Sequence, residues 1–254
     1  MKHILLTNDD GIDANGIFAL YKELKKLGDV TVVAPQIERS AVGHAITIHD
    51  PIRVLDYHRP EKFKGYAISG TPADCVKIGV KNLVHKKPDL IVSGINHGSN
   101  TATNVLYSGT VSAATEGIIM GIPSIASSMI AFDHKTDLTF AAEITAKIAR
   151  IVLDKGLPSD TLLNINIPPG PRTSIKGIAV TRQGRGRYEE EFEQRTDLSG
   201  RAYYWLTGKK MILDHEDDVD DVVVLKNKVS VTPIQIDLTA HKFLDELKTW
   251  NIEI

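Results

Sequence analysis

The sequence has a single cysteine, Cys75, among its 254 residues. Intramolecular disulfides are therefore impossible, and a zinc site built on several cysteines is excluded. Neither sign of charge is in excess, because the formal net charge is -2, so there is no electrostatic reason to expect a nucleic-acid polymer or an anionic membrane as a partner. No segment approaches the roughly 20 apolar residues that span a bilayer, and the apolar start of the chain is too short for a signal peptide. We expect a cytoplasmic protein without a membrane partner.

Several common motifs are also absent. The sequence contains no Gly-x-Ser-x-Gly elbow and no Walker-type loop, and its first apolar run does not lead into Gly-x-Gly-x-x-Gly. These absences argue against a dinucleotide cofactor.

Short apolar runs alternate with helix-like segments over the first 155 residues. We expect strands at residues 4–7, 30–34, 90–93, 124–127, 162–167 and 229–232, with shorter strands at 46–48, 52–55 and 66–68. We expect helices at residues 17–27, 72–80, 110–120 and 138–153. Continuous apolar strands between helices predict an α/β fold, namely a Rossmann-like, mostly parallel sheet with helices on both faces.

The last hundred residues are less regular. We expect one α/β domain over residues 1–254, with a catalytic core at 1–170 and a smaller β-rich extension at 171–254 that serves in oligomerisation. A basic, glycine-rich segment at residues 183–187 and an acidic one at 214–221 are interpreted as solvated loops.

Two adjacent acids, Asp9 and Asp10, follow the first apolar run, and Gly11 comes directly after them. Carboxylates side by side repel each other unless a cation lies between them, and a divalent metal ion is the simplest one. Gly11 gives the chain the freedom to turn both side chains toward one site. The alternative is that one aspartate caps the helix that starts near Ala14 while the other is solvated.

Two further loops carry oxygen donors, Ser40 and Asn96. Because both loops follow predicted parallel strands, they meet Asp9 and Asp10 at the edge where such sheets bind ligands. Taken singly, Ser40 is an ordinary loop serine and Asn96 part of a polar turn. Together, the four side chains make a shell of oxygen ligands that suits one Mg²⁺ or Mn²⁺ per subunit.

Ser108, Gly109 and Thr110 open a predicted helix. The free N–H groups and the positive end of a helix dipole bind anions, so we expect this turn to hold a phosphate group. The alternative is an ordinary Ser/Thr N-cap. We also assign Asn8, Gly43 and Asn96 to the phosphate-binding set.

A metal beside an anion site predicts hydrolysis of a phosphate ester by activated water, with Asp9 and Asp10 as the catalytic residues that bind the metal. Covalent attack on phosphorus by one of these aspartates is an alternative. His44 and His97 are candidate proton donors, although loop histidines are more often solvated, and Cys75 is expected to be a buried, inert thiol. The rival functions are a nucleotide-binding regulatory protein without turnover and a metal-dependent, nucleotide-sugar-binding protein.

The order of these motifs resembles that of the SurE survival-protein family. The matching segments are residues 8–17 (NDDGIDANGI), 33–35 (VAP) followed by Ser40, 70–76 (GTPADCV), 93–100 (SGINHGSN), 107–111 (YSGTV), 164–168 (NINIP) and 229–233 (VSVTP).

The resemblance implies a metal-dependent phosphatase of nucleoside 5'-monophosphates with a Rossmann-like core. It also implies homodimers or homotetramers in which C-terminal segments exchange between subunits. The family's metal ligands correspond to Asp9, Asp10, Ser40 and Asn96. One departure is residues 103–106 (TNVL), where many members have Gly-x-Asp-Val, so no role is transferred to Asn104.

Overall fold

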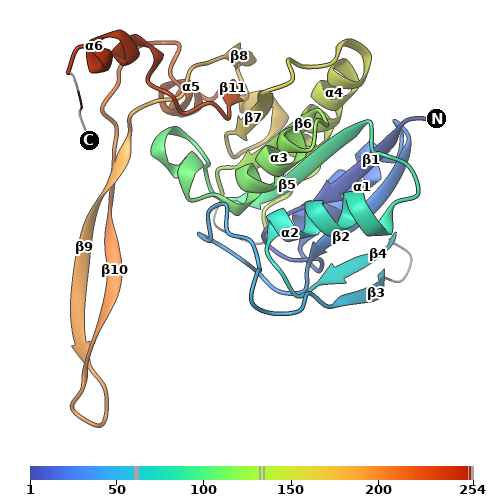
Figure 1. Cartoon of the computed structure of the whole chain (residues 1–254), viewed down its shortest axis with the longest axis horizontal. Helices are drawn as coiled ribbons and strands as arrows, with labels where there is room; N and C mark the ends of the chain where they lie inside the picture. The colour runs from blue at the N-terminus through green and yellow to red at the C-terminus, as the bar shows by residue number, and fades with distance from the viewer. Residues whose placement is uncertain (60–62, 132, 134, 251, 253–254) are drawn as a thin grey trace.

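The computed structural model describes residues 1–59, 63–131, 133, 135–250 and 252. They form a nine-stranded, mostly parallel sheet between two layers of helices, together with a separate two-stranded hairpin (Figure 1). The strands of the sheet, in spatial order, are β3 (Val54–Arg59), β4 (Phe63–Ile68), β2 (Asp29–Pro35), β1 (His3–Thr7), β5 (Leu90–His97), β6 (Ser124–Met129), β7 (Thr161–Ile167), β11 (Val229–Gln235) and β8 (Ile178–Val180). Within the sheet, β3 pairs antiparallel with β4, and β11 pairs antiparallel with β7. The predicted fold class is confirmed.

The strand β1 shows why the sheet is covered on both faces. Its apolar side chains alternate between two cores, because successive residues of a strand point to opposite faces. Ile4 and Leu6 pack with the helices α1 (Asn15–Leu24) and α4 (Thr139–Lys155), whereas Leu5 packs with α2 (Pro72–Ile78) and α3 (Gly109–Ile119). A strand buried on both faces needs a continuous apolar run, and β1 has one.

Several predicted boundaries shift in the structure. The helix predicted to reach residue 27 ends at Leu24, and its last residues form a turn. Strand β5 runs on through His97, with a register shift between Ser93 and Asn96, although residues from 94 onward had been predicted as loop. The strand predicted at residues 46–48 is wrong. This segment is a loop, tied to the start of α2 because the carboxylate of Asp74 accepts hydrogen bonds from the backbone and hydroxyl of Thr47.

The remaining elements lie mostly in the C-terminal part. They are η1 (Gly79–Leu83), η2 (Ala102–Leu106), η3 (Arg172–Ser174), β9 (Arg187–Thr196), β10 (Ala202–Met211), α5 (Asp220–Leu225), η4 (His241–Phe243) and α6 (Leu244–Lys248). Strands β9 and β10 form a long antiparallel hairpin that projects away from the sheet (Figure 1). No helix in the described part of the chain is long and apolar enough to cross a membrane.

The interpretation of residues 183–187 and 214–221 as solvated loops holds only in part, because residues 215–218 form an exposed loop whereas both ends of the acidic segment are buried. Asp214, Asp220 and Asp221 are all buried. The two segments bind each other, since the backbone N–H and the guanidinium of Arg185 both donate to Asp214. Their opposite charges are used in an internal contact, with α5 beginning at Asp220.

Candidate metal and phosphate site

Asp9 lies where β1 ends, directly below the N-terminus of α3. Its side chain is buried, and one carboxylate oxygen accepts the hydroxyl of Thr110 at 2.5 Å. A Cβ built on Gly109 would lie 2.8 Å from the Cβ of Asp9 and 3.0 Å from its Oδ2. The glycine therefore lets the first turn of the helix approach the carboxylate closely.

Burial makes the charge of Asp9 expensive. Burial, followed by the neighbouring charge of Asp10, raises the pKa of Asp9 to about 7, and the hydrogen bond from Thr110 opposes the rise. Among the described residues, no lysine or arginine forms an ion pair with either aspartate. A cation bound beside both carboxylates would remove this cost, so the residues present fit a divalent metal ion.

Asp10 is oriented by the end of β5. One of its carboxylate oxygens faces the backbone nitrogen of His97 at 3.3 Å and the ring Nδ1 of the same residue at 3.4 Å. The His97 side chain is only 6% exposed, so the expectation of a solvated loop histidine is wrong for this residue. Strand β5 thereby fixes one of the two acids.

Asn96 precedes His97 on β5 and is buried. Its amide NH₂ donates to the carbonyl of Gly98 at 3.0 Å. The side-chain carbonyl oxygen is then the atom suited to a hard cation. Asn96 lies next to His97, which contacts Asp10, so the structure places Asn96 near the acid pair, as the sequence predicted.

Ser40 lies in the loop after β2 and is exposed. Its hydroxyl donates to Glu38 at 2.5 Å. The loop itself is joined to the site, because the N–H of Arg39 donates to the carbonyl of Asp9 at 2.7 Å. The structure thus brings the segment of Ser40 beside Asp9, with the hydroxyl directed to Glu38, a carboxylate that sequence reasoning had passed over.

The alternative role for the aspartate pair, capping of the first helix, is wrong. The N-cap of α1 is Ala14, and no side chain caps it. Gly11 instead has a φ of +95°, a conformation that favours glycine. The NH₂ of Asn8 donates to the carbonyl of Gly11 at 2.8 Å, so Asn8 braces the turn that carries the two acids.

The N-terminus of α3 is capped as one of the two predictions for it expected. The Ser108 hydroxyl accepts the N–H of Val111 at 3.1 Å, so Ser108 is the N-cap. The positive end of the helix points toward Asp9 and would attract an anion held there. Gly43, with a φ of +56°, lies alongside and donates its N–H to the carbonyl of Tyr107 at 3.0 Å.

An ion-pair cluster around the buried Glu116, which the sequence did not reveal, holds this region together. The carboxylate of Glu116 on α3 accepts a hydrogen bond from Nε2 of His44 at 2.9 Å and another from the ammonium group of Lys77 at 2.7 Å. Burial alone would raise the pKa of Glu116, but the hydrogen bonds from both partners keep it below its usual value. The loop that carries Ser40 and Gly43 is thereby anchored to α3.

The chemistry of the donors decides which metals fit. The described part of the chain contains no cluster of three or more His, Cys, Asp or Glu side chains of the kind that binds zinc. The candidate shell has only two acids, with a serine and an asparagine as the other donors. Such a set favours Mg²⁺ or Mn²⁺ over zinc.

Comparison with known proteins identifies the family of the chain. The family model "Survival protein SurE" matches residues 4–190. The 5'-nucleotidase SurE of Chlorobium limicola is 49% identical over 251 residues, covering 99% of this chain and 97% of the relative. The 5'-nucleotidase SurE of Syntrophus aciditrophicus is 51% identical over 245 residues, covering 96% of this chain and 92% of the relative.

A solved structure from the same family has the same fold. The crystal structure of the SurE protein from Aquifex aeolicus superposes with a TM-score of 0.84 at 41% identity, over 98% of this chain and all of that one. The matched regions cover nearly the whole chain. The chain belongs to the survival protein SurE family.

Proposed function

We propose that the protein is a divalent-metal-dependent 5'-nucleotidase that hydrolyses nucleoside 5'-monophosphates to nucleoside and phosphate. The observation that carries the proposal is the buried Asp9, next to Asp10 and below the N-terminus of α3. A carboxylate pair is unfavourable for binding phosphate alone, and it becomes useful when a cation joins the two. The relatives that match nearly the whole chain are named 5'-nucleotidase SurE, which supports the same activity.

The residues of the chain have distinct tasks in this proposal. Asp9, Asp10, Asn96 and Ser40 hold one Mg²⁺ or Mn²⁺, which polarises the phosphoryl group and activates water when it is bound. The turn at residues 108–110 neutralises the developing charge on the phosphate oxygens with backbone N–H groups and the helix dipole.

The supporting residues keep this arrangement in place. Asn8 fixes the turn after β1, and His97 fixes Asp10. Gly43 brings the loop of Ser40 against the residue before Ser108. Preorganised groups of this kind need no rearrangement when the transition state forms.

Release of inorganic phosphate from AMP tests the proposal. The protein with Mn²⁺ should release phosphate from AMP, and Asp10→Asn should reduce the rate by at least a hundredfold. Asp154→Asn is a matched control, because Asp154 is an exposed acid on α4, and it should keep the wild-type rate. Binding of AMP without release of phosphate would overturn the proposal in favour of a nucleotide-binding regulatory protein.

We further propose that the protein is a homodimer or homotetramer and that the β9–β10 hairpin contacts another subunit. The hairpin exposes large apolar side chains that a lone hairpin cannot bury, namely Tyr188, Phe192, Tyr203, Tyr204, Trp205, Leu206 and Met211. Light scattering should give the mass of two or four chains. A monomer at micromolar concentration would contradict this assignment.

A further inference from the structure

The segment η2 connects the two halves of the candidate site. It follows β5, which carries Asn96, and it leads into Ser108 at the N-terminus of α3. Just after η2, the carbonyl of Tyr107 accepts the N–H of Gly43. The path of η2 therefore decides where the phosphate-binding turn lies relative to β1 and β5.

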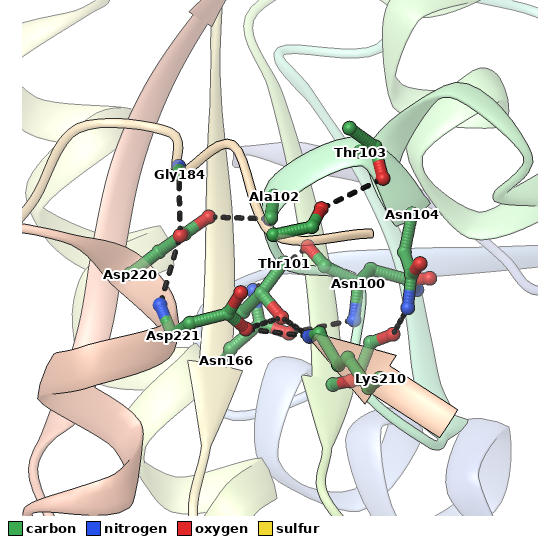
Figure 2. Close-up of polar contacts among 12 residues, drawn as sticks. Asn100, Thr101, Ala102, Thr103, Asn104, Asn166, Gly184, Lys210, Asp220 and Asp221 are labelled. Atoms are coloured by element: carbon green, nitrogen blue, oxygen red, sulfur yellow. Dashed lines mark hydrogen bonds and ion pairs between the residues drawn. The ribbon is translucent and has the colours of Figure 1, made fainter. Parts of the chain in front are cut away.

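Residues from the last quarter of the chain hold η2 in place. The carboxylate of Asp220 accepts the N–H of Ala102 and the N–H of Gly184, each at 2.9 Å, and the N–H of Asp221 at 2.8 Å (Figure 2). Asp220 is completely buried. Burial raises its pKa, and the three N–H donors oppose that rise. Loss of a hydrogen bond to a buried carboxylate is costly, because the unpaired polar group cannot bond water instead.

The glycine-rich segment at residues 183–187 adds further restraints. The carbonyl of Gly186 accepts both the N–H and the hydroxyl of Thr103, and the side-chain NH₂ of Gln183 donates to the carbonyl of Ala102 at 2.9 Å. Ala102 has a φ of +51°, a backbone conformation that residues other than glycine rarely adopt. A backbone in this conformation persists only where its surroundings over-determine it.

Lys210 links this cluster to the hairpin. It lies on β10, and its ammonium group is 2.5 Å from Oδ1 of Asp221 and 2.6 Å from the hydroxyl of Thr101 (Figure 2). The Thr101 hydroxyl donates to the same oxygen of Asp221 at 2.5 Å. The side chain of Lys210 is 21% exposed and that of Asp221 only 6%, so this pair is sheltered from the screening that weakens surface pairs.

We propose that Lys210, Thr101 and Asp221 are positioning residues that transmit the seating of the β9–β10 hairpin to η2. They thereby align the N-terminus of α3 with Asp9. The catalytic consequence rests on the proposed function, whereas the mechanical link does not. Because the hairpin is also the proposed subunit contact, its seating in an oligomer would set the activity of each site.

The test uses the intact protein and two independent pairs of variants. Lys210→Met removes the ammonium group, and Lys209→Met makes the same change at an exposed neighbour on β10, whose side chain points to the other face of the hairpin. Thr101→Val removes the hydroxyl without changing any residue of the hairpin, and Thr101→Ser keeps it. Hydrogen exchange of the backbone and the kcat and KM for AMP are measured for each variant.

We expect Lys210→Met and Thr101→Val to speed exchange at the amides of Ala102 and Thr103 at least tenfold. We expect the same variants to lower kcat about tenfold with less than a threefold change in KM, since small misplacements act on the transition state. Lys209→Met and Thr101→Ser should match the wild type in both measurements.

Two results would overturn the inference. One is unchanged exchange at Ala102 and Thr103 in Lys210→Met and Thr101→Val. The other is faster exchange with an unchanged kcat, which would separate η2 from the site. A wild-type protein that releases no phosphate would refute the proposed function instead, and the exchange comparison would still decide whether the hairpin holds η2.

Discussion

Replacing Asp9 by asparagine should stabilise the metal-free protein. The substitution keeps the shape of the side chain and an oxygen that can accept the Thr110 hydroxyl, but it removes a charge that is buried beside Asp10. The pKa of Asp9 is raised from 3.8 to about 7, and each unit corresponds to ~1.36 kcal/mol. Asp9 therefore costs the folded wild type about 4 kcal/mol of stability at pH values above about 7, and Asp9→Asn should recover most of it.

The sign of the pH dependence follows from the direction of the shift. Below pH 3.8 the carboxyl is protonated in both the folded and the unfolded chain, so the charge of Asp9 makes no difference between wild type and variant. Between pH 3.8 and about 7 only the unfolded chain is ionised, which lowers the stability of the wild type as pH rises. The advantage of Asp9→Asn should grow over this window and level off above it.

Urea unfolding in excess chelator at pH 8 measures the difference. Asp9→Asn should unfold at a higher midpoint than the wild type, and the control Asp154→Asn should differ by less than about 0.5 kcal/mol. Saturating Mn²⁺ at a hundred times its dissociation constant should add about 2.7 kcal/mol to the wild type and little to Asp9→Asn. A variant less stable than the wild type in chelator would refute the reasoning, because Asp9 would then be structural.

Three further predictions concern residues around the site. Gly109→Ala should lower phosphate release at least tenfold and cost about 1–3 kcal/mol of stability, because the added Cβ would press on Asp9. Kinetics and urea unfolding would measure the two effects, and an unchanged rate would contradict the close approach of Gly109 to Asp9. Glu116→Gln should cost about 1–2 kcal/mol at pH 7, a figure reduced for the partial exposure of Lys77 and His44. Because the pKa of Glu116 is lowered, this difference in urea unfolding should shrink as pH falls through 4.5 and below, and a difference that grows would refute the ion-pair account. Burial raises the pKa of the Cys75 thiol, so iodoacetamide at pH 8 should label it only in unfolded protein, as mass spectrometry would show; rapid labelling of the folded protein would contradict its burial.

Apolar patterning was enough to predict the core of the fold. The apolar run at residues 4–6 is continuous because both faces of β1 are covered. A short continuous apolar run between helices is typical of a parallel strand buried on both faces. The patterning failed where tertiary contacts override local preference. Residues 94–97 contain glycine and asparagine, which are typical of loops, but neighbouring strands hold them in β5. Residues 46–48 have the alternation of a strand but are held as a loop by Asp74.

The candidate site was predictable only in part. Residue type and position at strand ends pointed to Asp9, Asp10 and Asn96, because ligands bind at that edge of a parallel sheet. The partners of buried charges could not be predicted from the sequence, since they are remote along the chain. Glu116 meets a histidine 72 positions away, and Asp221 meets Thr101 across 120 positions. No periodicity records such pairs, so the burial of Asp214, Asp220 and Asp221 at the ends of the acidic segment was not predicted.

The central claim is that the adjacent carboxylates of Asp9 and Asp10 serve a divalent metal ion. It is tested most directly by AMP hydrolysis in metal-free protein before and after Mn²⁺ is restored. The proposed function predicts no release of phosphate in excess chelator and full recovery when Mn²⁺ is added back. Undiminished hydrolysis of AMP in excess chelator would contradict it.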